Sequence, residues 1–341
     1  MLNTVYRLVA PRQFEAEFAD IDLRADHVIV RPTYLSICNA DQRYYQGNRD
    51  PKVLKKKLPM ALIHEGIGEI IYDTKREFHP GDRVVMVPNT PEETDDIIAE
   101  NYLRSSRFRA SGFDGFMQEL VSIRRDRVLM LPAWINPEVA AFTEFVSVAY
   151  HAIRRFDRKA HCRRDHIGFW GDGNLAYTTS LLFRKLFPDT TIHIFGKHDS
   201  KLEDFVFADC SWNITDIPDS VRVDHAFECI GGVASGAGIN QIIDLINPEG
   251  TVSILGVSED LVPVNTRMIL EKGLTVFGSS RSGVQDFADV IALFENNPEI
   301  VDYLEKIINR VVSISTIKDM NAAFDLDMQR ISGKTVMKWM R

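Results

Sequence analysis

The sequence predicts an α/β protein in which a doubly wound parallel sheet is joined to a second, β-rich domain. After about residue 165, short apolar strand candidates alternate with helix-like segments, which is the pattern of a parallel sheet. Residues 1–140 instead carry closely spaced strand candidates separated by turns. A chain of 341 residues is long enough for two domains with cores of their own.

The β-rich region begins the chain and has turns such as Pro80-Gly81-Asp82 between its strands. Its strand candidates are residues 5–9, 27–32, 67–72, 82–88 and 117–123. A long polar stretch, residues 90–115, interrupts them, and it is either a functional or mobile segment or a solvated surface lobe. Residues 135–155 predict a helix, because Asn136-Pro137-Glu138 suits a helix N-terminus.

Residues 166–176 predict a turn that binds a dinucleotide. An apolar strand ends at Trp170, and the following residues fit the fingerprint G-x-G-x-x-G/A. The first glycine permits a tight turn, the second lets the backbone approach a pyrophosphate, and a small third residue lets helix and strand pack closely. Helix-like residues 174–186 and strand candidate 191–195 complete a βαβ unit. The predicted cofactor-binding residues of the turn are Gly171, Gly173, Asn174, Leu175 and Ala176.

The later segments complete this domain and then leave it. Strand candidates follow at residues 223–229, 251–257 and 274–278, and helix-like segments at residues 284–296 and 316–326. A last strand candidate, residues 334–339, is expected to return to the β-rich domain. We therefore predict a discontinuous first domain, residues 1–150 and 285–341, around a dinucleotide-binding domain, residues 151–284.

The end of strand candidate 191–195 favours NADP(H) over NAD(H). An NAD enzyme places Asp or Glu about 20 residues past the glycine turn, where it binds a ribose hydroxyl. This chain has Gly196 and Lys197 there, and its first acid is Asp199. Glycine leaves room, and Lys197 supplies positive charge for a 2′-phosphate. The alternative is that Lys197 and His198 form an ordinary solvated loop.

Composition excludes several other classes of protein. The net charge of −8 argues against a general nucleic-acid or anionic-membrane binder. No apolar run approaches the ~18 residues that a membrane span needs, and no signal-peptide pattern is present, so we expect a cytoplasmic protein. The four cysteines, at 38, 162, 210 and 229, are too scattered to indicate a disulfide framework.

Cys38, His64 and Glu144 form a chemically sensible set of zinc ligands. Three protein ligands leave a fourth position open for water or substrate, as a catalytic zinc site requires. Each residue also has a simpler interpretation. Cys38 could be a small buried hydrophobe, His64-Glu65 a hydrogen-bonded surface pair, and Glu144 a helix cap or a partner of an arginine.

Several motifs resemble those of the zinc-dependent medium-chain dehydrogenase/reductase family in their residues, their order and their spacing. They are Cys38-Asn39-Ala40-Asp41, His64-Glu65-Gly66, Pro80-Gly81-Asp82-Arg83-Val84, Ala141-Phe142-Thr143-Glu144-Phe145-Val146-Ser147-Val148 and Gly171-Asp172-Gly173-Asn174-Leu175-Ala176. The resemblance implies a Rossmann domain and a GroES-like catalytic domain. It also implies that Cys38, His64 and Glu144 bind catalytic zinc, with Glu65 as an adjacent or alternating ligand. The segment around Glu144 is similar to the polyol dehydrogenase branch of the family.

Two departures from the family pattern matter. The four-cysteine lobe that binds structural zinc is absent, and residues 90–115 take its place, so we expect one zinc per chain. The family usually has Ser or Thr two residues after the zinc cysteine, as the first hydroxyl of a proton relay, whereas this chain has Ala40. Tyr44, Tyr45 or a water molecule near Glu65 is therefore a candidate proton donor.

A narrower resemblance is to the bacterial ribulose-5-phosphate reductases of teichoic-acid and capsule synthesis, in residues 31–47, 58–69 and 103–119. It implies that NADPH and zinc reduce D-ribulose 5-phosphate to D-ribitol 5-phosphate. It also implies a homodimer and a partner cytidylyltransferase that makes CDP-ribitol. Such a substrate needs cations, and the candidates for its phosphate are Arg43, Arg104 and Arg281, with Arg107 and Arg109 nearby in the sequence. Each of these arginines could equally be an ordinary surface cation.

Three other functions remain as alternatives. A zinc-free quinone or enoyl reductase would not need Cys38, His64 and Glu144 together. A polyol or alcohol dehydrogenase acting on an unphosphorylated substrate differs only in its phosphate requirement. A non-catalytic, nucleotide-binding scaffold for a partner enzyme would not consume NADPH.

Overall fold

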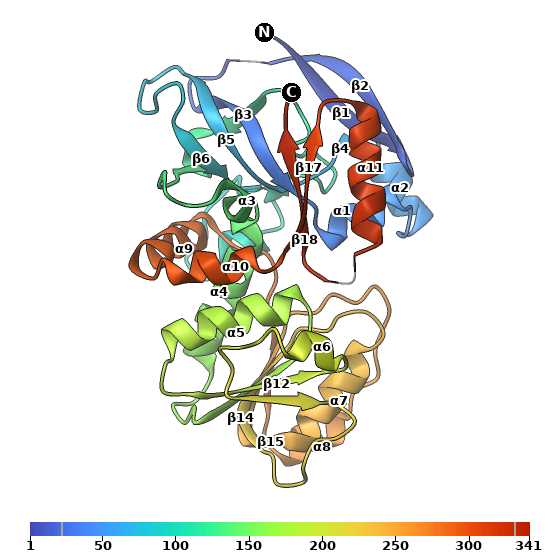
Figure 1. Ribbon diagram of the computed structural model, residues 1–341, viewed down its shortest axis with the longest axis vertical. Coiled ribbons are helices and arrows are strands. Elements are labelled where there is room, and N and C mark those ends of the chain that lie inside the picture. The colour runs from blue at the N-terminus through green and yellow to red at the C-terminus, as the bar shows by residue number, and fades with distance from the viewer. Residues whose placement is uncertain (22, 331) are drawn as a thin grey trace. The chain divides into compact units, whose positions relative to one another are not determined.

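The computed structural model describes residues 1–21, 23–330 and 332–341, which form two compact units. Unit 1 comprises Met1–Ser147 and Ser282–Arg341, and unit 2 comprises Val148–Arg281 (Figure 1). Unit 1 is built mainly from antiparallel strands, whereas unit 2 contains a six-stranded parallel sheet. The predicted fold class, a doubly wound parallel sheet with a β-rich domain, is confirmed.

The strands of unit 1 are β1 (Leu2–Ala10), β2 (Gln13–Asp20), β3 (His27–Ser36), β4 (Met60–Ala61), β5 (Glu65–Asp73), β6 (Arg83–Met86), β7 (Asn89–Thr90), β8 (Arg107–Phe108), β9 (Val121–Arg124), β10 (Val128–Met130), β17 (Ile308–Ile314) and β18 (Lys334–Trp339). Its helices are α1 (Asn39–Tyr45), α2 (Pro51–Lys57), α3 (Pro137–Ala140), α9 (Val284–Asn296), α10 (Glu299–Glu305) and α11 (Ile317–Met328), with short 3₁₀ turns η1 (Glu100–Tyr102) and η2 (Arg125–Arg127). Helix α4 (Thr143–Lys159) begins in unit 1 and ends in unit 2.

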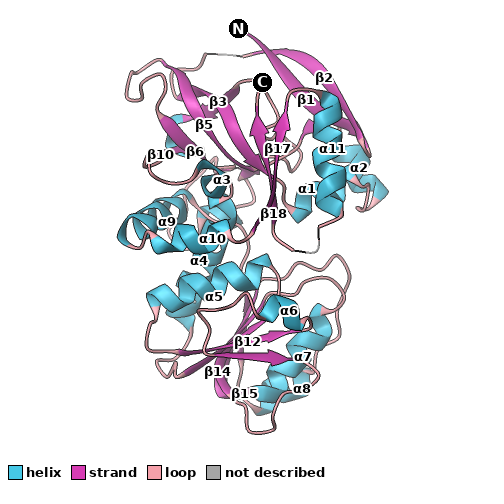
Figure 2. Ribbon diagram, in the orientation of Figure 1, coloured by secondary structure: helices cyan, strands magenta, loops and turns pink. Residues whose placement is uncertain are grey.

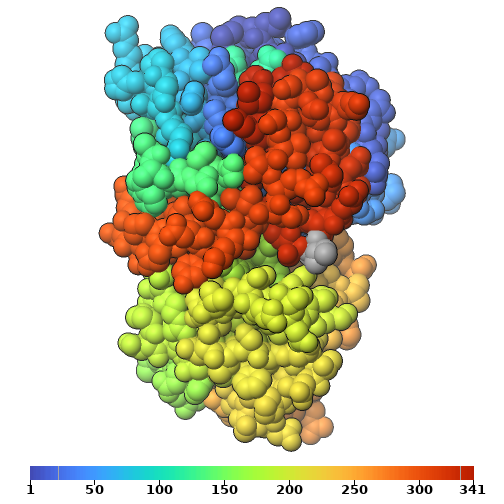
Figure 3. All heavy atoms as spheres, in the orientation of Figure 1, coloured from blue at the N-terminus to red at the C-terminus, as the bar shows by residue number. Residues whose placement is uncertain are grey.

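The main sheet of unit 1 has the order β10-β6-β5-β3-β18-β17, with β9 pairing to β3. The C-terminal strand β18 therefore joins the sheet formed by the first part of the chain, as expected from its sequence. Helix α11 packs against β2 and β17, and the C-terminal segment, red in Figure 3, covers much of the visible face of this unit. The core beneath it is rich in aliphatic side chains from β1, β3 and β5.

Unit 2 has the strand order β13-β12-β11-β14-β15-β16, and every pairing in this sheet is parallel. Its elements are β11 (His166–Trp170), α5 (Asn174–Leu186), β12 (Thr191–Gly196), α6 (Asp199–Leu202), β13 (Cys210–Asn213), β14 (Val223–Glu228), α7 (Ser235–Leu245), β15 (Ile246–Ile254), α8 (Thr266–Glu271) and β16 (Thr275–Gly278). The chain winds outward from β11 to β13, then returns to place β14 beside β11. Figure 2 shows β12, β14 and β15 of this sheet in magenta. Ligands of such sheets bind at the carboxyl ends of the strands, where the winding direction changes.

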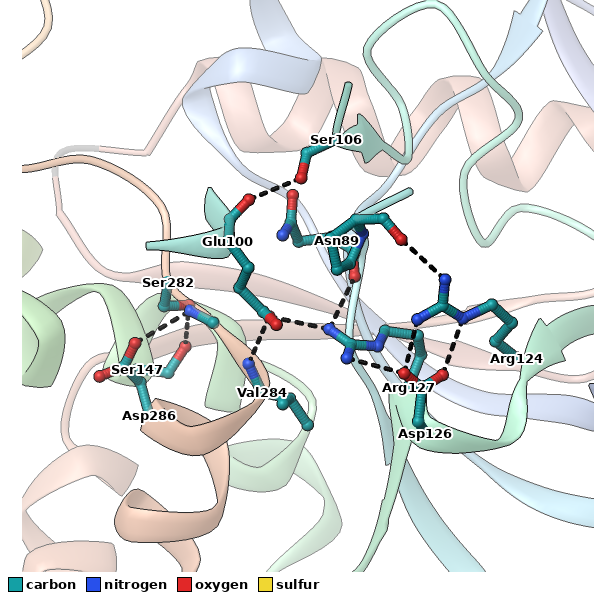
Figure 4. A network of polar contacts seen from close by, with 12 residues as sticks. Asn89, Glu100, Ser106, Arg124, Asp126, Arg127, Ser147, Ser282, Val284 and Asp286 are labelled. Carbon is teal, nitrogen blue, oxygen red and sulfur yellow. Dashed lines mark hydrogen bonds and ion pairs between the residues drawn. The ribbon is translucent and has the colours of Figure 1, made fainter. Parts of the chain in front are cut away.

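The polar stretch 90–115 forms a folded lobe with a fixed base. Glu100 Oε1 accepts hydrogen bonds from Arg127 Nη1 and from the backbone N–H of Val284, each 2.8 Å long (Figure 4). Ser106 Oγ donates to the Glu100 carbonyl at 2.6 Å. The exposed part of the lobe, residues 92–99, lies beyond this network. The solvated-lobe interpretation therefore describes its outer part, while Glu100 ties its base to the start of α9.

Two sequence expectations need correction in detail. The helix predicted over residues 135–155 is two helices, α3 and α4, because the α3 turn ends at Ala141 before α4 begins at Thr143. The strand predicted over residues 117–123 begins only at Val121. Within the described residues, no helix is long and apolar enough to cross a membrane.

Candidate metal centre and cofactor site

Strand β3 ends between β5 and β18. The register of these three strands brings the segment after β3, the start of β5 and the start of β18 close together. Ser36 pairs with Glu65 of β5 on one side and with Val336 of β18 on the other. Cys38 follows two residues after Ser36, and His64 directly precedes β5. A Cβ on Gly66 would lie 2.5 Å from Leu35 Cδ2, so glycine allows β5 to approach β3 closely here.

Cys38, His64 and Glu65 form a compact group of potential metal ligands. One ligand atom from each lies within 4.8 Å of the others, and both His64 and Glu65 are buried. The structure thus brings together two of the three predicted ligands and the predicted alternating ligand. A thiolate, an imidazole and a carboxylate are the donor types that zinc prefers in proteins.

Asp41 is a residue of the candidate metal centre that was not among the predicted ligands. Its carboxylate is fully buried and accepts hydrogen bonds from the backbone N–H groups of Cys38 (3.1 Å) and Ile63 (3.0 Å). Its Oδ1 also lies 3.6 Å from His64 Nδ1. Burial opposes a charge on His64, yet Asp41 and Cys38 hold the pKa of His64 well above its usual value. Asp41 therefore ties both ligand-bearing segments together and orients the imidazole.

The backbone before His64 adopts an unusual conformation. Ile63 has a φ of 71°, in the left-handed region that a β-branched residue rarely enters. Its N–H donates to Asp41, and its carbonyl accepts a 2.7 Å hydrogen bond from the N–H of Phe116. Strain of this kind is kept only where the surroundings fix it, and it is common at functional sites.

Glu65 already has a cationic partner. Lys334 Nζ, at the start of β18, donates to Glu65 Oε1 at 2.8 Å and lies 2.6 Å from Oε2, with both side chains almost completely buried. The same ammonium lies 4.7 Å from the centre of the Phe145 ring. Lys334 balances the charge of Glu65, so this carboxylate does not need a metal ion to be stable in the interior. Sequence inspection could not pair two residues separated by 269 positions.

Glu144 is buried and lacks such a partner. In the described part of the chain, its carboxylate makes neither a hydrogen bond nor an ion pair, and only 5% of the residue is exposed. Burial raises the pKa of Glu144 to about 7; His64 and Lys334 lower it, whereas Glu65 and Asp41 raise it further. These effects place Glu144 in the field of the same cluster. An unpaired buried acid in the field of His64 and Glu65 fits a zinc ligand.

The two candidate tyrosines have different surroundings. The Tyr45 hydroxyl lies 3.1 Å from Asp325 Oδ1, and its ring stacks on Phe324, so Tyr45 belongs to the packing between α1 and α11. Burial raises its pKa. The Tyr44 hydroxyl is buried without a hydrogen-bond partner in the described residues, and its ring lies under the guanidinium of Arg49 at 4.2 Å. Tyr44 and water therefore remain the better candidates for the proton donor.

Two of the five arginines considered for phosphate binding already serve the fold. Arg109 is partly buried, and its guanidinium donates to the carbonyls of Asp114 (3.2 Å) and Ser122 (2.6 Å). Burial lowers the pKa of Arg109 to about 10. Arg107 forms an ion pair with Glu92 at 2.5 Å. Of the other three, Arg43 and Arg104 belong to unit 1, and Arg281 ends unit 2.

The dinucleotide turn has the geometry that its sequence predicts. Gly171 has a φ of 129°, and a Cβ there would lie 3.2 Å from the Cys229 backbone. Gly173 caps helix α5, and a Cβ there would meet no atom within 4 Å. Packing within unit 2 therefore does not require glycine at 173, whereas close approach of a ligand would. Ala176 is fully buried where α5 meets the sheet.

The neighbouring strand ends are held by two acids, the buried Glu228 and the partly buried Asp172, that sequence inspection overlooked. Glu228, at the end of β14, accepts hydrogen bonds from the N–H groups of Ile230 (2.8 Å), Gly231 (3.0 Å) and Gly256 (3.1 Å). Asp172, inside the fingerprint, accepts from the N–H groups of Lys197 and His198. Their signal in the sequence is an acid directly beside a glycine turn. Together they fix the loops at the carboxyl edge of the sheet.

A dinucleotide-binding sheet combined with a Cys-His-Glu cluster defines a metal-dependent dehydrogenase. Residues 24–133 match the model of the alcohol dehydrogenase GroES-like domain, and residues 207–296 match that of the zinc-binding dehydrogenases. Ribulose-5-phosphate reductase 1 of Staphylococcus aureus is 54% identical over 99% of both chains, and ribulose-5-phosphate reductase of Bacillus spizizenii is 53% identical over the same shares. The chain therefore belongs to the zinc-binding dehydrogenase family.

Solved structures show the same likeness. The crystal structure of S. aureus TarJ in complex with NADPH covers 100% of both chains, with a TM-score of 0.90 and 49% sequence identity. Galactitol-1-phosphate dehydrogenase from Escherichia coli, at 19% identity and a TM-score of 0.79, shares the fold.

Proposed function

We propose that this protein reduces D-ribulose 5-phosphate to D-ribitol 5-phosphate, using NADPH and one catalytic zinc. The observation that carries the proposal is the identity above 50%, over 99% of both chains, to ribulose-5-phosphate reductases of two bacterial genera. The TarJ structure contains NADPH, in agreement with the preference inferred from Gly196 and Lys197. The product would feed CDP-ribitol synthesis for teichoic acid or capsule.

Cys38, His64 and Glu144 would hold the zinc, with Glu65 kept in place by Lys334 or joining as an alternating ligand. The unpaired, buried Glu144 supports this assignment, because a cation would offset the cost of burying its charge. Bound zinc supplies a Lewis acid for the ketone oxygen, and NADPH supplies the hydride. Asp41 orients His64, and Gly171, Gly173, Asn174, Leu175 and Ala176 form the cofactor turn. Residues 90–115 contain no cysteine, which supports one zinc per chain.

The test compares NADPH oxidation with ribulose 5-phosphate and with ribulose at saturating NADPH. A phosphate held by one or more of Arg43, Arg104 and Arg281 would gain roughly 1.5–3 kcal/mol per charge-assisted hydrogen bond. Since each 1.4 kcal/mol is about tenfold, kcat/KM should be at least ~100-fold higher for the phosphorylated ketose. Xylulose 5-phosphate and fructose 6-phosphate are the controls for sugar specificity.

Equal efficiency with ribulose and its phosphate would contradict the proposal in favour of a polyol dehydrogenase. An absence of NADPH oxidation with every ketose, in zinc-loaded protein, would favour the non-catalytic scaffold instead. Neither outcome would change the assignment of the chain to its family.

We also propose that the protein is a cytoplasmic homodimer that cooperates with a ribitol-5-phosphate cytidylyltransferase. The dimer is supported by β16, which lies at the edge of the parallel sheet, and by nearby exposed apolar side chains. Leu261 is fully exposed, and Leu270 is 79% exposed. Light scattering measures the oligomeric state, and Leu261→Asp is expected to favour the monomer. Co-purification with the cytidylyltransferase tests whether the two proteins associate.

A further inference from the structure

The end of β12 has no room for the acid that an NAD enzyme carries there. A Cβ on Gly196 would lie 2.7 Å from Leu202 Cδ2 and 2.8 Å from Asp172 Cβ. The space beside Gly196 is therefore filled by the fingerprint turn itself. An acid is nevertheless present at this strand end, because Asp172 places its carboxylate there from the neighbouring turn.

The Asp172 carboxylate is fully engaged by the turn after β12. Its Oδ2 accepts hydrogen bonds from the N–H groups of Lys197 (2.8 Å) and His198 (2.9 Å), and it also lies 2.8 Å from Nδ1 of the His198 ring. Burial would raise the pKa of Asp172, but these hydrogen bonds hold it below its usual value. The carboxylate is thus ionised at neutral pH, and it is directed at the protein rather than at a ribose.

The contact with Asp172 fixes how His198 meets a ligand. Nδ1 faces Asp172, so the other ring nitrogen, Nε2, is left without a hydrogen bond in the described residues while half of the side chain is exposed. When the imidazole is protonated, its Nε2–H can donate a charged hydrogen bond to a ligand. The negative charge of Asp172 then balances the positive charge of the ring. Lys197 is exposed on the same turn, and Asp199 is occupied by Asn213 Nδ2 at 2.8 Å.

We propose that His198, held by Asp172, is a specificity-determining residue that binds the 2′-phosphate of NADPH together with Lys197. The inference rests on the proposed NADPH dependence and names the group responsible for it. Asp172, Lys197 and Asp199 are the charged groups around the ring.

The test measures binding of 2′,5′-ADP and 5′-AMP to the zinc-loaded, full-length protein by calorimetry. His198→Ala should weaken binding of 2′,5′-ADP by about tenfold, the loss of one charge-assisted hydrogen bond, and leave 5′-AMP unchanged. His198→Arg should keep the affinity for 2′,5′-ADP, because a guanidinium also donates charged hydrogen bonds to a phosphate. His79→Ala is the matched control, because His79 is also exposed and lies near an aspartate, Asp82, in unit 1.

Three outcomes would overturn the assignment. If His198→Ala weakens both ligands equally, the residue only supports the turn. If it changes neither ligand while the unmodified protein still prefers 2′,5′-ADP, another group recognises the phosphate and only this inference fails. If the unmodified protein does not distinguish the two ligands, the proposed NADPH dependence fails with it.

Discussion

In unit 1 the buried acids Glu65 and Glu144 lie among other charged side chains, whereas in unit 2 the buried Glu228 is surrounded by backbone amides. Amides near in sequence can hold a carboxylate wherever a loop has the right conformation. A cluster of side chains can be neutralised only by residues from distant segments or by a bound cation. The buried acids of unit 1 therefore depend on Lys334 and on a bound cation, whereas that of unit 2 depends on the conformation of nearby loops.

The two units should also respond to pH in opposite directions. Glu144 in unit 1 is an acid whose pKa burial raises to about 7. His193 in unit 2 is a base whose pKa is lowered to about 4 by burial and, to a smaller extent, by the neighbouring His166. Without zinc, unit 1 should lose stability as pH rises, whereas unit 2 should lose stability as pH falls.

The largest expected effect is on catalysis, through Cys38→Ser. Loss of the thiolate would remove a proposed zinc ligand, and Lewis-acid stabilisation is worth several kcal/mol, so kcat/KM should fall by roughly a thousandfold or more. Near-UV circular dichroism should stay unchanged, because this zinc is catalytic and does not hold a small domain together. Metal analysis should find one zinc in the unmodified protein and much less in the variant. Cys162→Ser, at an exposed cysteine of unit 2, is the control.

Two zinc ions per chain, or full activity without zinc, would contradict this account of unit 1.

Lys334→Met should have the largest effect on stability. It leaves Glu65 without its ion-pair partner in the buried cluster, and breaking a buried ion pair from one side costs about 3–5 kcal/mol. The free energy of unfolding in denaturant measures the change, and Lys334→Arg should recover most of it. If Lys334→Met is as stable as the unmodified protein, the ion pair does not balance the cluster.

Local patterns predicted unit 2 better than unit 1. Helix α5 has the bounds expected from its sequence, because its apolar spacing and its glycine turn are both local signals. Strand β2 was not predicted, since only Phe14 of its eight residues is buried and the apolar alternation is weak. Strand β17 was also missed; it is paired with β18 but mostly exposed or half-buried.

The residues of the candidate sites also differ in how well the sequence could predict them. Cys38, His64 and Glu144 could be proposed from residue types and a family resemblance. Lys334 could not, because its role depends on the register between β3 and β18. Asp172 occupies a variable position of the fingerprint, so the motif did not indicate a role for it. Its role depends on the contact between the fingerprint turn and the turn after β12. Side-chain partners across strands are set by tertiary packing, which a single sequence does not display.

Removal of zinc should expose the pH dependence of Glu144. The usual pKa is 4.5, so between about pH 4.5 and 7 the folded, zinc-free protein binds a proton that the unfolded chain does not. Stability should therefore fall as pH rises through this window, by up to about 3 kcal/mol. Denaturant unfolding of chelator-treated protein at pH 5 and pH 8 measures the loss.

Zinc-loaded protein should not show this loss, and Glu144→Gln should make the chelated protein insensitive to pH in the same range. An equal loss in Glu144→Gln would assign the effect to another group.

The smallest expected effect is the acid sensitivity of unit 2. Trp212 Nε1 donates to His193 Nδ1 at 3.1 Å, so Nδ1 must be an acceptor, and the proton on Nε2 faces His166 Nδ1 at 3.0 Å. Protonation of His193 would break the tryptophan contact. Between pH 6.5 and about 4 the unfolded state binds the extra proton, so stability falls with acidification, by about 1–2 kcal/mol for a partly buried group.

Hydrogen exchange of β11 to β13 at pH 7 and pH 5 measures this change, because local opening of the strands reports on the pairing that His193 supports. In His193→Asn an amide oxygen can still accept from Trp212 but cannot titrate. This variant should exchange somewhat faster than the unmodified protein at pH 7, and the difference should shrink at pH 5 after correction for intrinsic exchange rates. If the variant keeps the acid sensitivity of the unmodified protein, a different group controls unit 2, and the contrast in pH response between the two units no longer rests on the buried histidine.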